Sequence, residues 1–188
     1  MQKIKPQFRP NPKAPNFLDD TIRTVIFVVV VSVLLEMAIP RSLVDGRSMF
    51  PTYEDRERLI VSRAHYLVTD IRRGDVIVFN SVERPDDEML IKRVIGLPGD
   101  TLEFRSSELY INGQLVPEPY IKECLSRCSD RTWEVPEDSY FVMGDNRDGS
   151  RDSRVFGSVP ISNVVGRVIF RYWPLPRIGL AGHYEHDF

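Results

Sequence analysis

The stretch MLIKRVIGLPGD, residues 89–100, contains a short apolar segment and the turn that ends it. Leu90, Lys92 and Val94 alternate on one face of an extended chain, and Ile91 and Ile95 occupy the other. The Pro-Gly pair at 98–99 suits the central positions of a type II turn. A short apolar run that ends in turn residues predicts a β-strand.

Similar short runs recur along the rest of the chain between turn residues. They are DVIVF (75–79), TLEF (101–104), ELYINGQLV (108–116), SYFVM (139–143) and VVGRVIFRYW (164–173). Asn112-Gly113 between apolar alternations is a strong hairpin signal, and long helical periodicity is absent after Pro40. We therefore predict an all-β domain over 40–188 with Greek-key or barrel-like antiparallel sheets. Residues 117–138 are expected to form a loop or a small lobe.

The N-terminal part of the chain has a different composition. Residues 1–16 contain four prolines, four basic residues and no acid, which is typical of an extended solvated tail. From Val25 to Leu35 the chain is apolar except at Ser32, and Arg23 and Glu36 flank this run. With these two charges reaching toward the interfaces, residues 17–39 are long enough for a single transmembrane helix.

Two other interpretations of this segment are a buried core helix and a cleavable signal peptide. The first lacks a surrounding domain to be buried in, and the second would need a better small-x-small site than EMAIPRS offers. The basic residues ahead of the segment predict a cytoplasmic tail by the positive-inside rule. The β domain would then lie on the trans side of the membrane, in the periplasm, at the extracellular face or in the thylakoid lumen.

Composition argues against several other classes of protein. The net charge is −2 and the basic residues are scattered among acidic ones, so nucleic-acid binding is not expected. Cys124 and Cys128 lack zinc-ligand spacing and a second Cys/His pair, so no metal site and no cofactor are expected. A disulfide and two reduced buried thiols both remain compatible with the sequence.

The stretch LVDGRSMFPT, residues 43–52, contains a candidate nucleophile in Ser48. Its surroundings lack the second glycine of a G-x-S-x-G nucleophile elbow. Pro51 disfavours a helical Phe50, so Ser48 is expected on an extended or turning segment. His65 remains an alternative base, although it has no acidic neighbour in sequence, and His183 and His186 lie in a polar tail.

Lysine is scarce in the body of the chain. Three of the five lysines fall within the first thirteen residues, which leaves Lys92 and Lys122. Burial in an apolar strand would lower the pKa of Lys92 and so make its neutral amine available as a general base. A lowering from about 10.4 to about 8 costs roughly 3 kcal/mol, which a folded domain can carry. The other interpretation is a surface lysine whose stem covers apolar neighbours.

Four stretches in order, DGRSMFPT, RGDVIVF, LIKRVIGLPGD and GDNRDGSRDSR, resemble those of type I signal peptidases, also called leader peptidases. These are membrane-anchored serine proteases that remove signal peptides from translocated preproteins. The resemblance implies a signal-peptidase-like all-β fold, with Ser48 as nucleophile and Lys92 as general base. It also implies cleavage after small residues at positions −3 and −1, and the secretion translocon as a further partner beside preproteins and the lipid bilayer.

The fourth stretch, residues 144–154, contains no apolar side chain. It fails the calcium-loop pattern, in which Asp or Asn residues alternate along the loop. The resemblance instead implies that Ser150 orients the lysine amine and that Asp152 and Arg154 form an ion pair. Asp145 is expected to support the same loop. A plain solvated turn is the alternative.

The resemblance also indicates residues around the scissile bond. The backbone N–H of Ser48 is expected to donate to the oxyanion, while Gly46 replaces a serine found in many family members and leaves the second donor open. The expected substrate-pocket residues are Val44, Leu90, Ile91 and, more weakly, Ser42. We expect Met49 and Phe50 to reach the bilayer, with a core position as the alternative for Phe50.

Two other classes of protein are alternatives to a signal peptidase. A non-catalytic membrane-anchored β domain could carry Ser48 and Lys92 as ordinary residues. A self-cleaving regulator of the SOS-repressor type also uses a Ser/Lys dyad, but the sequence shows neither a DNA-binding segment nor an obvious Ala-Gly or Cys-Gly bond before Ser48.

Overall fold

The computed structural model of the 188-residue chain describes residues 17–38, 41–43, 46–62, 70–84, 88–121 and 124–181. Two compact units are present, Met1–Met37 and Ala38–Phe188, and each is considered by itself. The predicted tail over 1–16 lies outside the described residues, as do Val44, His65, Lys122, His183 and His186.

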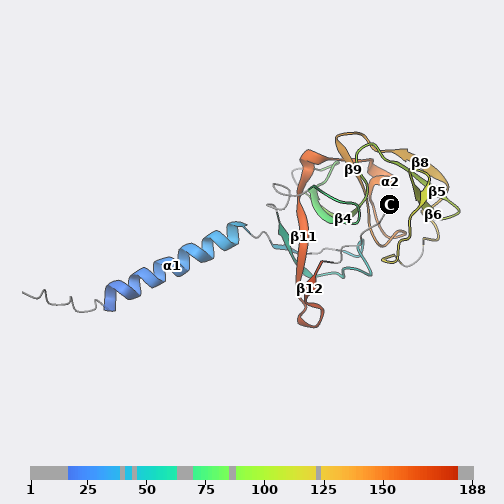
Figure 1. Cartoon of the computed structure of the whole chain (residues 1–188). Coiled ribbons are helices and arrows are strands. Elements are labelled where there is room, and N and C mark those ends of the chain that lie inside the picture. Colours follow the sequence, from blue (N-terminus) through green and yellow to red (C-terminus); the bar gives the residue numbers. More distant parts are fainter. Residues whose placement is uncertain are drawn as a thin grey trace, which may run out of the picture. The chain divides into compact units, whose positions relative to one another are not determined.

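The described part of the first unit is helix α1 (Phe17–Ala38), where the sequence predicts a helix over 17–39 (Figure 1). Its side chains are described between residues 20 and 32, and apolar ones such as Val25, Phe27 and Val29 are more than half exposed. Among residues whose side chains are described, which in α1 means only 20–32, no helical stretch is both long and apolar enough to cross a bilayer.

The second unit is built mainly of antiparallel strands, so the predicted all-β domain is confirmed as a mostly-β fold that also contains short helical segments. Its larger sheet has eight strands in the order β1-β2-β11-β3-β4-β9-β10, with β12 paired to β11. Their bounds are β1 (Arg41–Leu43), β2 (Arg58–Ser62), β3 (Val76–Asn80), β4 (Met89–Gly96), β9 (Ser139–Met143), β10 (Val159–Pro160), β11 (Val164–Trp173) and β12 (Gly179–Leu180). Strands far apart in sequence therefore lie side by side, as β4 and β9 do.

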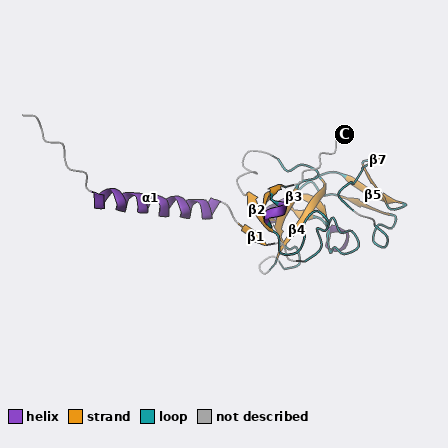
Figure 2. Ribbon diagram, turned by 90° about the horizontal axis from the view of Figure 1, so that it is seen from below, coloured by secondary structure: helices purple, strands orange, loops and turns teal. Residues whose placement is uncertain are grey.

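A second sheet of four strands forms a lobe, in the order β7-β6-β5-β8. Its strands are β5 (Thr101–Arg105), β6 (Glu108–Ile111), β7 (Gln114–Leu115) and β8 (Arg131–Glu134). The predicted hairpin turn is present, with Asn112 at φ 52° and Gly113 at φ 80°. The expected loop over 117–138 thus carries β8 and belongs to a larger lobe. Figures 1 and 2 show the lobe strands on one side of the β domain and β11 with β2 on the other.

Short helical segments connect the strands from β9 to β12. They are α2 (Ser153–Phe156) and the 3₁₀ turns η2 (Ile161–Asn163) and η3 (Leu175–Arg177). Helix α2 begins after Asp152, whose side chain accepts a hydrogen bond from the Arg154 backbone N–H. This cap is the usual way to satisfy a free N–H at a helix start, and it fixes the end of the polar loop after β9.

The two sheets meet where β4 ends and β5 begins. Gly96, the last residue of β4, lies so close to the lobe core that an added Cβ would sit 2.6 Å from Leu102 Cδ1 and 2.9 Å from Val135 Cγ2. Leu102 and Phe141 are both buried in this core. A glycine is therefore required here for space.

We expect Gly96→Ala to lower the free energy of unfolding by about 1–3 kcal/mol, because the new methyl group overpacks the core between the sheets. Urea denaturation of the purified β domain measures the change. Gly179→Ala is the control: its Cβ would meet no atom within 4 Å, so it should change stability by less than about 1 kcal/mol. Equal stability of the two variants would contradict this packing argument.

Candidate active site

The structure brings Ser48 and Lys92 into direct contact, although 44 residues separate them in sequence. The Lys92 Nζ lies 2.9 Å from the Ser48 Oγ and donates a second hydrogen bond of 2.9 Å to the Ile91 carbonyl. Lys92 is only 3% exposed. The two groups are close enough for direct proton transfer.

The environment of Lys92 favours its neutral form. Burial lowers the pKa of the amine to about 8, and the negative charges of Asp152, Glu88 and Asp145 oppose that change without cancelling it. About a tenth of the amines are therefore neutral at pH 7, compared with less than about a thousandth at the ordinary lysine pKa. Lys92 thus has the protonation behaviour that a general base requires.

Local structure explains how the two residues reach these positions. Lys92 lies in the middle of β4, where its register partner on β3 is Ile77. Ser48 lies in a turn that is anchored by the fully buried Met49 and by Tyr53, whose N–H donates to the Met49 carbonyl. The expectation that Met49 reaches the bilayer is therefore wrong, because its side chain packs in the core. Phe50 is half-buried.

We call residues 144–152 the catalytic loop, because they follow β9 directly beside Ser48. The backbone N–H of Asn146 donates to the Ser48 carbonyl at 3.0 Å, and its side-chain amide donates to the Arg47 carbonyl at 3.0 Å. A Cβ on Gly144 would collide with the Ser48 carbonyl oxygen and with the Ser150 side chain. Glycine at 144 therefore lets the loop pack against residues 46–53, which contain Ser48 and which we call the serine segment.

Asp152 and Arg154 form an ion pair at the far end of this loop. The Arg154 Nε and Nη2 donate to the two carboxylate oxygens of Asp152 at 2.8 Å each, and the Gly144 N–H donates to the same carboxylate at 3.0 Å. Burial alone would raise the pKa of Asp152, but these donors outweigh it and keep the pKa below its ordinary value. The two ends of the loop, at Gly144 and Asp152, are thereby joined through a charged carboxylate.

Ser150 is buried beside Gly144, but among the described residues its hydroxyl makes no hydrogen bond with the Lys92 amine. Its Oγ has no hydrogen-bond partner of ordinary geometry among the described residues, although it lies near enough to Asp152 to help keep the pKa of that carboxyl low. The lysine-orienting role implied for Ser150 by the family resemblance stays a prediction.

Asp145 lies at a junction of three segments. The Arg93 Nε and Nη2 donate to its carboxylate at 2.8 Å and 2.6 Å, and the Thr52 hydroxyl donates to it at 2.5 Å. The Arg93 guanidinium also stacks over the Tyr120 ring, 4.2 Å from its centre. The Arg93–Asp145 pair ties together β4, the catalytic loop and the serine segment. Sequence analysis missed Arg93 and Thr52, although a second charge beside Lys92 in an apolar strand was the available signal.

An open cavity of about 330 Å³ lies over the serine–lysine pair. Of the four residues expected to form the substrate pocket, Leu90 lines this cavity, whereas Ile91 packs partly buried against the core around Met49. Ser42 lies in β1 opposite Leu59, and Val44 is outside the described residues. The cavity is lined by Gly46, Arg47, Ser48, Ser81, Glu83, Arg84, Glu88, Leu90, Lys92, Gly149, Arg151 and Phe156.

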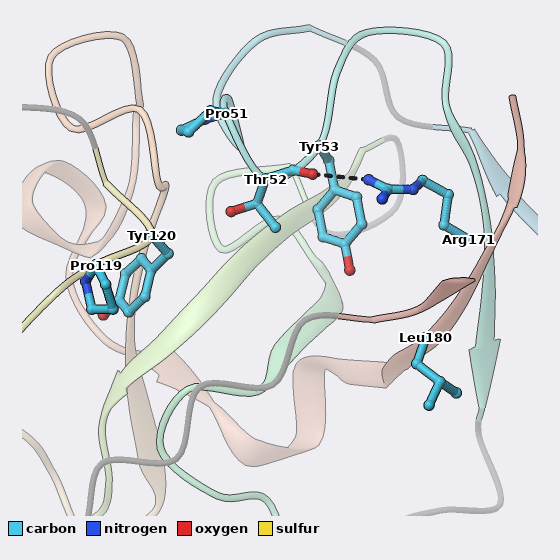
Figure 3. Close-up of a pocket in the computed structure, with 7 residues that line it drawn as sticks. All are labelled: Pro51, Thr52, Tyr53, Pro119, Tyr120, Arg171 and Leu180. Atoms are coloured by element: carbon cyan, nitrogen blue, oxygen red, sulfur yellow. Dashed lines mark hydrogen bonds between the residues drawn. The ribbon is translucent and has the colours of Figure 1, made fainter. Parts of the chain in front are cut away.

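A second cavity, of about 320 Å³, lies along the serine segment (Figure 3). Pro51, Thr52 and Tyr53 line it, and Arg171 from β11 donates to the Thr52 carbonyl at 3.0 Å. Tyr120 of the lobe lies across the opening from Tyr53 (Figure 3). Arg171 thus fixes the chain four residues after the nucleophile.

Cys124 and Cys128 form a disulfide with a Cα–Cα distance of 5.7 Å. Of the two alternatives that the sequence left open, the structure therefore has the bonded one.

A serine hydroxyl in contact with a buried amine, at the base of an open cavity, is the arrangement of a serine hydrolase that uses lysine as its base. Comparisons with known proteins agree. A sequence profile described as "Signal peptidase, peptidase S26" matches residues 18–173. A "Signal peptidase I" of Leptolyngbya laminosa is 39% identical over 181 residues, which is 91% of this chain and 87% of that protein.

A "Signal peptidase I" of Bacillus caldolyticus is 41% identical over 162 residues, covering 79% of this chain and 87% of that protein. A crystal structure of a signal peptidase I from Enterococcus faecalis V583 aligns with a TM-score of 0.48 at 37% identity, over 53% of this chain and 97% of that one. The chain belongs to the signal peptidase family, peptidase S26. The predicted type I signal peptidase function and the predicted serine peptidase class are confirmed.

We expect Asp145→Ala to destabilise the β domain by about 3–5 kcal/mol, because it leaves the fully buried Arg93 guanidinium without its counter-charge. Thermal or urea unfolding measures the loss. Glu103→Ala, which removes a partly exposed carboxylate paired with Arg105, is the control and should leave stability almost unchanged. If both variants unfold at the same denaturant concentration, the Arg93–Asp145 pair does not have the structural role assigned to it.

Proposed function

We propose that the chain cleaves signal peptides from preproteins with Ser48 as nucleophile and Lys92 as general base. The observation that carries this proposal is the 2.9 Å contact between the Ser48 Oγ and a buried Lys92 Nζ whose pKa is lowered to about 8. A neutral amine at this distance can accept the hydroxyl proton, whereas a solvated lysine would be charged at neutral pH.

The reaction follows as an acyl transfer in two stages. The neutral Nζ accepts the Ser48 hydroxyl proton while the Oγ attacks the scissile carbonyl carbon. The protonated amine then donates its proton to the leaving amine as the tetrahedral intermediate collapses to an ester. Water attacks that ester with Lys92 again as base, which releases the serine hydroxyl.

We assign the backbone N–H of Ser48 as a hydrogen-bond donor to the oxyanion of the intermediate. Gly46 has no side chain to contribute, and its own N–H already donates to the Asp55 carboxylate at 2.9 Å. The second oxyanion donor must therefore be a group other than Gly46.

The substrate is proposed to bind as an extended strand in the 330 Å³ cavity. Small residues at −1 and −3 suit shallow apolar contacts such as the one offered by Leu90. Signal-peptide-bearing preproteins present such residues ahead of the cut, as the family resemblance implies.

We expect Ser48→Ala and Lys92→Ala each to lower kcat/KM by about a thousandfold or more, because each removes a group that forms or breaks bonds. Incubation of the detergent-solubilised chain with a preprotein, followed by mass spectrometry, reports both activity and cut site. Lys122→Ala is the matched control and should cleave normally. Appreciable cleavage by a folded Lys92→Ala variant at neutral pH would refute the dyad.

We also propose that α1 anchors the chain in a membrane, with the basic tail in the cytoplasm and the β domain on the trans side. The exposed apolar side chains of α1 and the four basic residues ahead of it support this placement. The Cys124–Cys128 disulfide supports an oxidising compartment for the β domain. The bilayer, and the translocon beside it, would then be its surroundings.

If α1 is an anchor, the full chain should stay in the membrane pellet after alkaline carbonate extraction, and external protease should digest the β domain only from its own side. Removing residues 1–39 should release the domain into the supernatant with its activity retained in detergent. Release of the full chain by carbonate would rule out a membrane-spanning anchor.

A further inference from the structure

Asp148, in the middle of the catalytic loop, is the hydrogen-bond acceptor for a second loop. We call residues 124–128, closed by the disulfide, the disulfide loop. The Asp148 carboxylate accepts the backbone N–H groups of Leu125, Ser126 and Arg127 at 2.9, 3.0 and 3.1 Å. It also accepts the Ser126 hydroxyl at 3.0 Å. One carboxylate thus fastens three consecutive residues of a distant segment.

Three successive N–H groups that point at one carboxylate form an anion-binding nest. These hydrogen bonds lower the pKa of Asp148 to about 2, so the carboxylate stays charged throughout the pH range in which Lys92 titrates. Among the described residues, Asp148 forms no ion pair with an arginine, unlike Asp145 and Asp152 in the same loop. Its charge is balanced by backbone dipoles of the disulfide loop.

The disulfide loop holds the catalytic loop at a second point. The Arg127 side chain donates from Nη1 to the Ser150 carbonyl at 3.0 Å, and the Arg127 carbonyl accepts from Arg154 Nη1 at 3.1 Å. Arg154 is itself paired with Asp152. The segment between Asp148 and Asp152 is therefore attached to the disulfide loop at both ends.

This attached segment borders the cavity that contains the catalytic lysine. Gly149 and Arg151 line the same cavity as Ser48 and Lys92. Just before it, Asn146 donates to the Ser48 carbonyl and accepts the Gly149 N–H at 3.1 Å through its side chain. Loosening at Asp148 would therefore reach the wall of the cavity beside Lys92 and, through Asn146, the support of Ser48.

We propose that Asp148 is a positioning residue for the Ser48–Lys92 pair, which acts by fastening the disulfide loop to the catalytic loop and so keeping water away from the Lys92 amine. This inference rests on the function proposed above for that pair. It assigns no contact between Asp148 and the substrate.

The proposal has a specific consequence for the pH dependence of cleavage. Desolvation is the largest cause of the lowered pKa of Lys92, whereas the charges of Asp152, Glu88 and Asp145 act in the opposite direction. When the loop loosens and water reaches the amine, desolvation weakens and the pKa of Lys92 rises toward its ordinary value. The neutral fraction at pH 7 then falls, but at high pH it recovers.

The test is Asp148→Ala in the full chain, with kcat/KM for a preprotein measured from pH 6 to pH 10. In the unchanged protein, kcat/KM should rise through about pH 8. In the variant this rise should move about one pH unit higher, so that the loss is about tenfold at pH 7 and largely disappears near pH 10. A variant that is merely less folded would lose activity without moving the profile.

The matched control is Asp130→Ala. Asp130 also accepts a hydrogen bond from a backbone N–H, that of Ser106 at 2.8 Å, but in the described part of the chain it makes no hydrogen bond or ion pair with the catalytic loop. Its removal should leave the pH profile unchanged. A second variant, Cys124→Ser with Cys128→Ser, loosens the same loop from the other side, so its profile shift should not add to that of Asp148→Ala.

An unshifted profile in folded Asp148→Ala would overturn the proposal, as would fully additive shifts in the combined variant. Failure of the dyad itself is recognised separately, because Lys92→Ala would then keep its activity whatever Asp148 does. The proposal is supported only if Lys92→Ala is inactive and Asp148→Ala shifts the profile upward while Asp130→Ala does not.

Discussion

The burial of one amine beside one hydroxyl is the constraint on which the rest of the structure depends. Removing Lys92 from water costs free energy, and it is this cost that makes the amine neutral often enough to act as a base. Every carboxylate near that amine would reduce the effect by favouring its charged form. The structure resolves the conflict by engaging Asp145 and Asp152 with arginines of their own. The arginines therefore serve the lysine indirectly, because they neutralise charges that would otherwise keep it protonated.

Arginine suits this supporting role because it cannot lose its proton in a protein and can bind a carboxylate through two parallel hydrogen bonds. Arg93 and Arg154 both do so, and Arg147 makes a third buried pair with Glu118. Each pair joins segments that are distant in sequence or closes the polar loop after β9. The site thus combines groups of permanent charge, which hold the backbone in place, with one group whose charge changes during the reaction.

Much of this arrangement could be predicted from sequence. Short apolar runs and the Asn112-Gly113 turn identified the strands and the hairpin, and the apolar neighbours of Lys92 made burial one of two interpretations, which the structure decides in favour of burial. What failed depended on contacts across the fold. Met49 packs in the core because Tyr53 and β11 cover it, and no local pattern indicates that. Likewise, the sequence around Arg93 does not indicate Asp145 as its partner, because the two residues come together only when β4 and β9 are adjacent in the sheet. Ile91 is also partly buried through contacts across the fold, because it packs against the core cluster around Met49.

Lys92 and Arg93 are consecutive residues of β4, so their side chains leave the strand on opposite faces. Their register partners on β3 are Ile77 and Val76. A slip of this strand by a single residue toward its N-terminal end would put Arg93 in the place of Lys92 and present the serine with a guanidinium, which cannot surrender a proton at any physiological pH. The resulting molecule could keep its sheet and still be inert. Correct alignment of β4 during folding is therefore itself a prerequisite for proteolysis, quite apart from its value to stability.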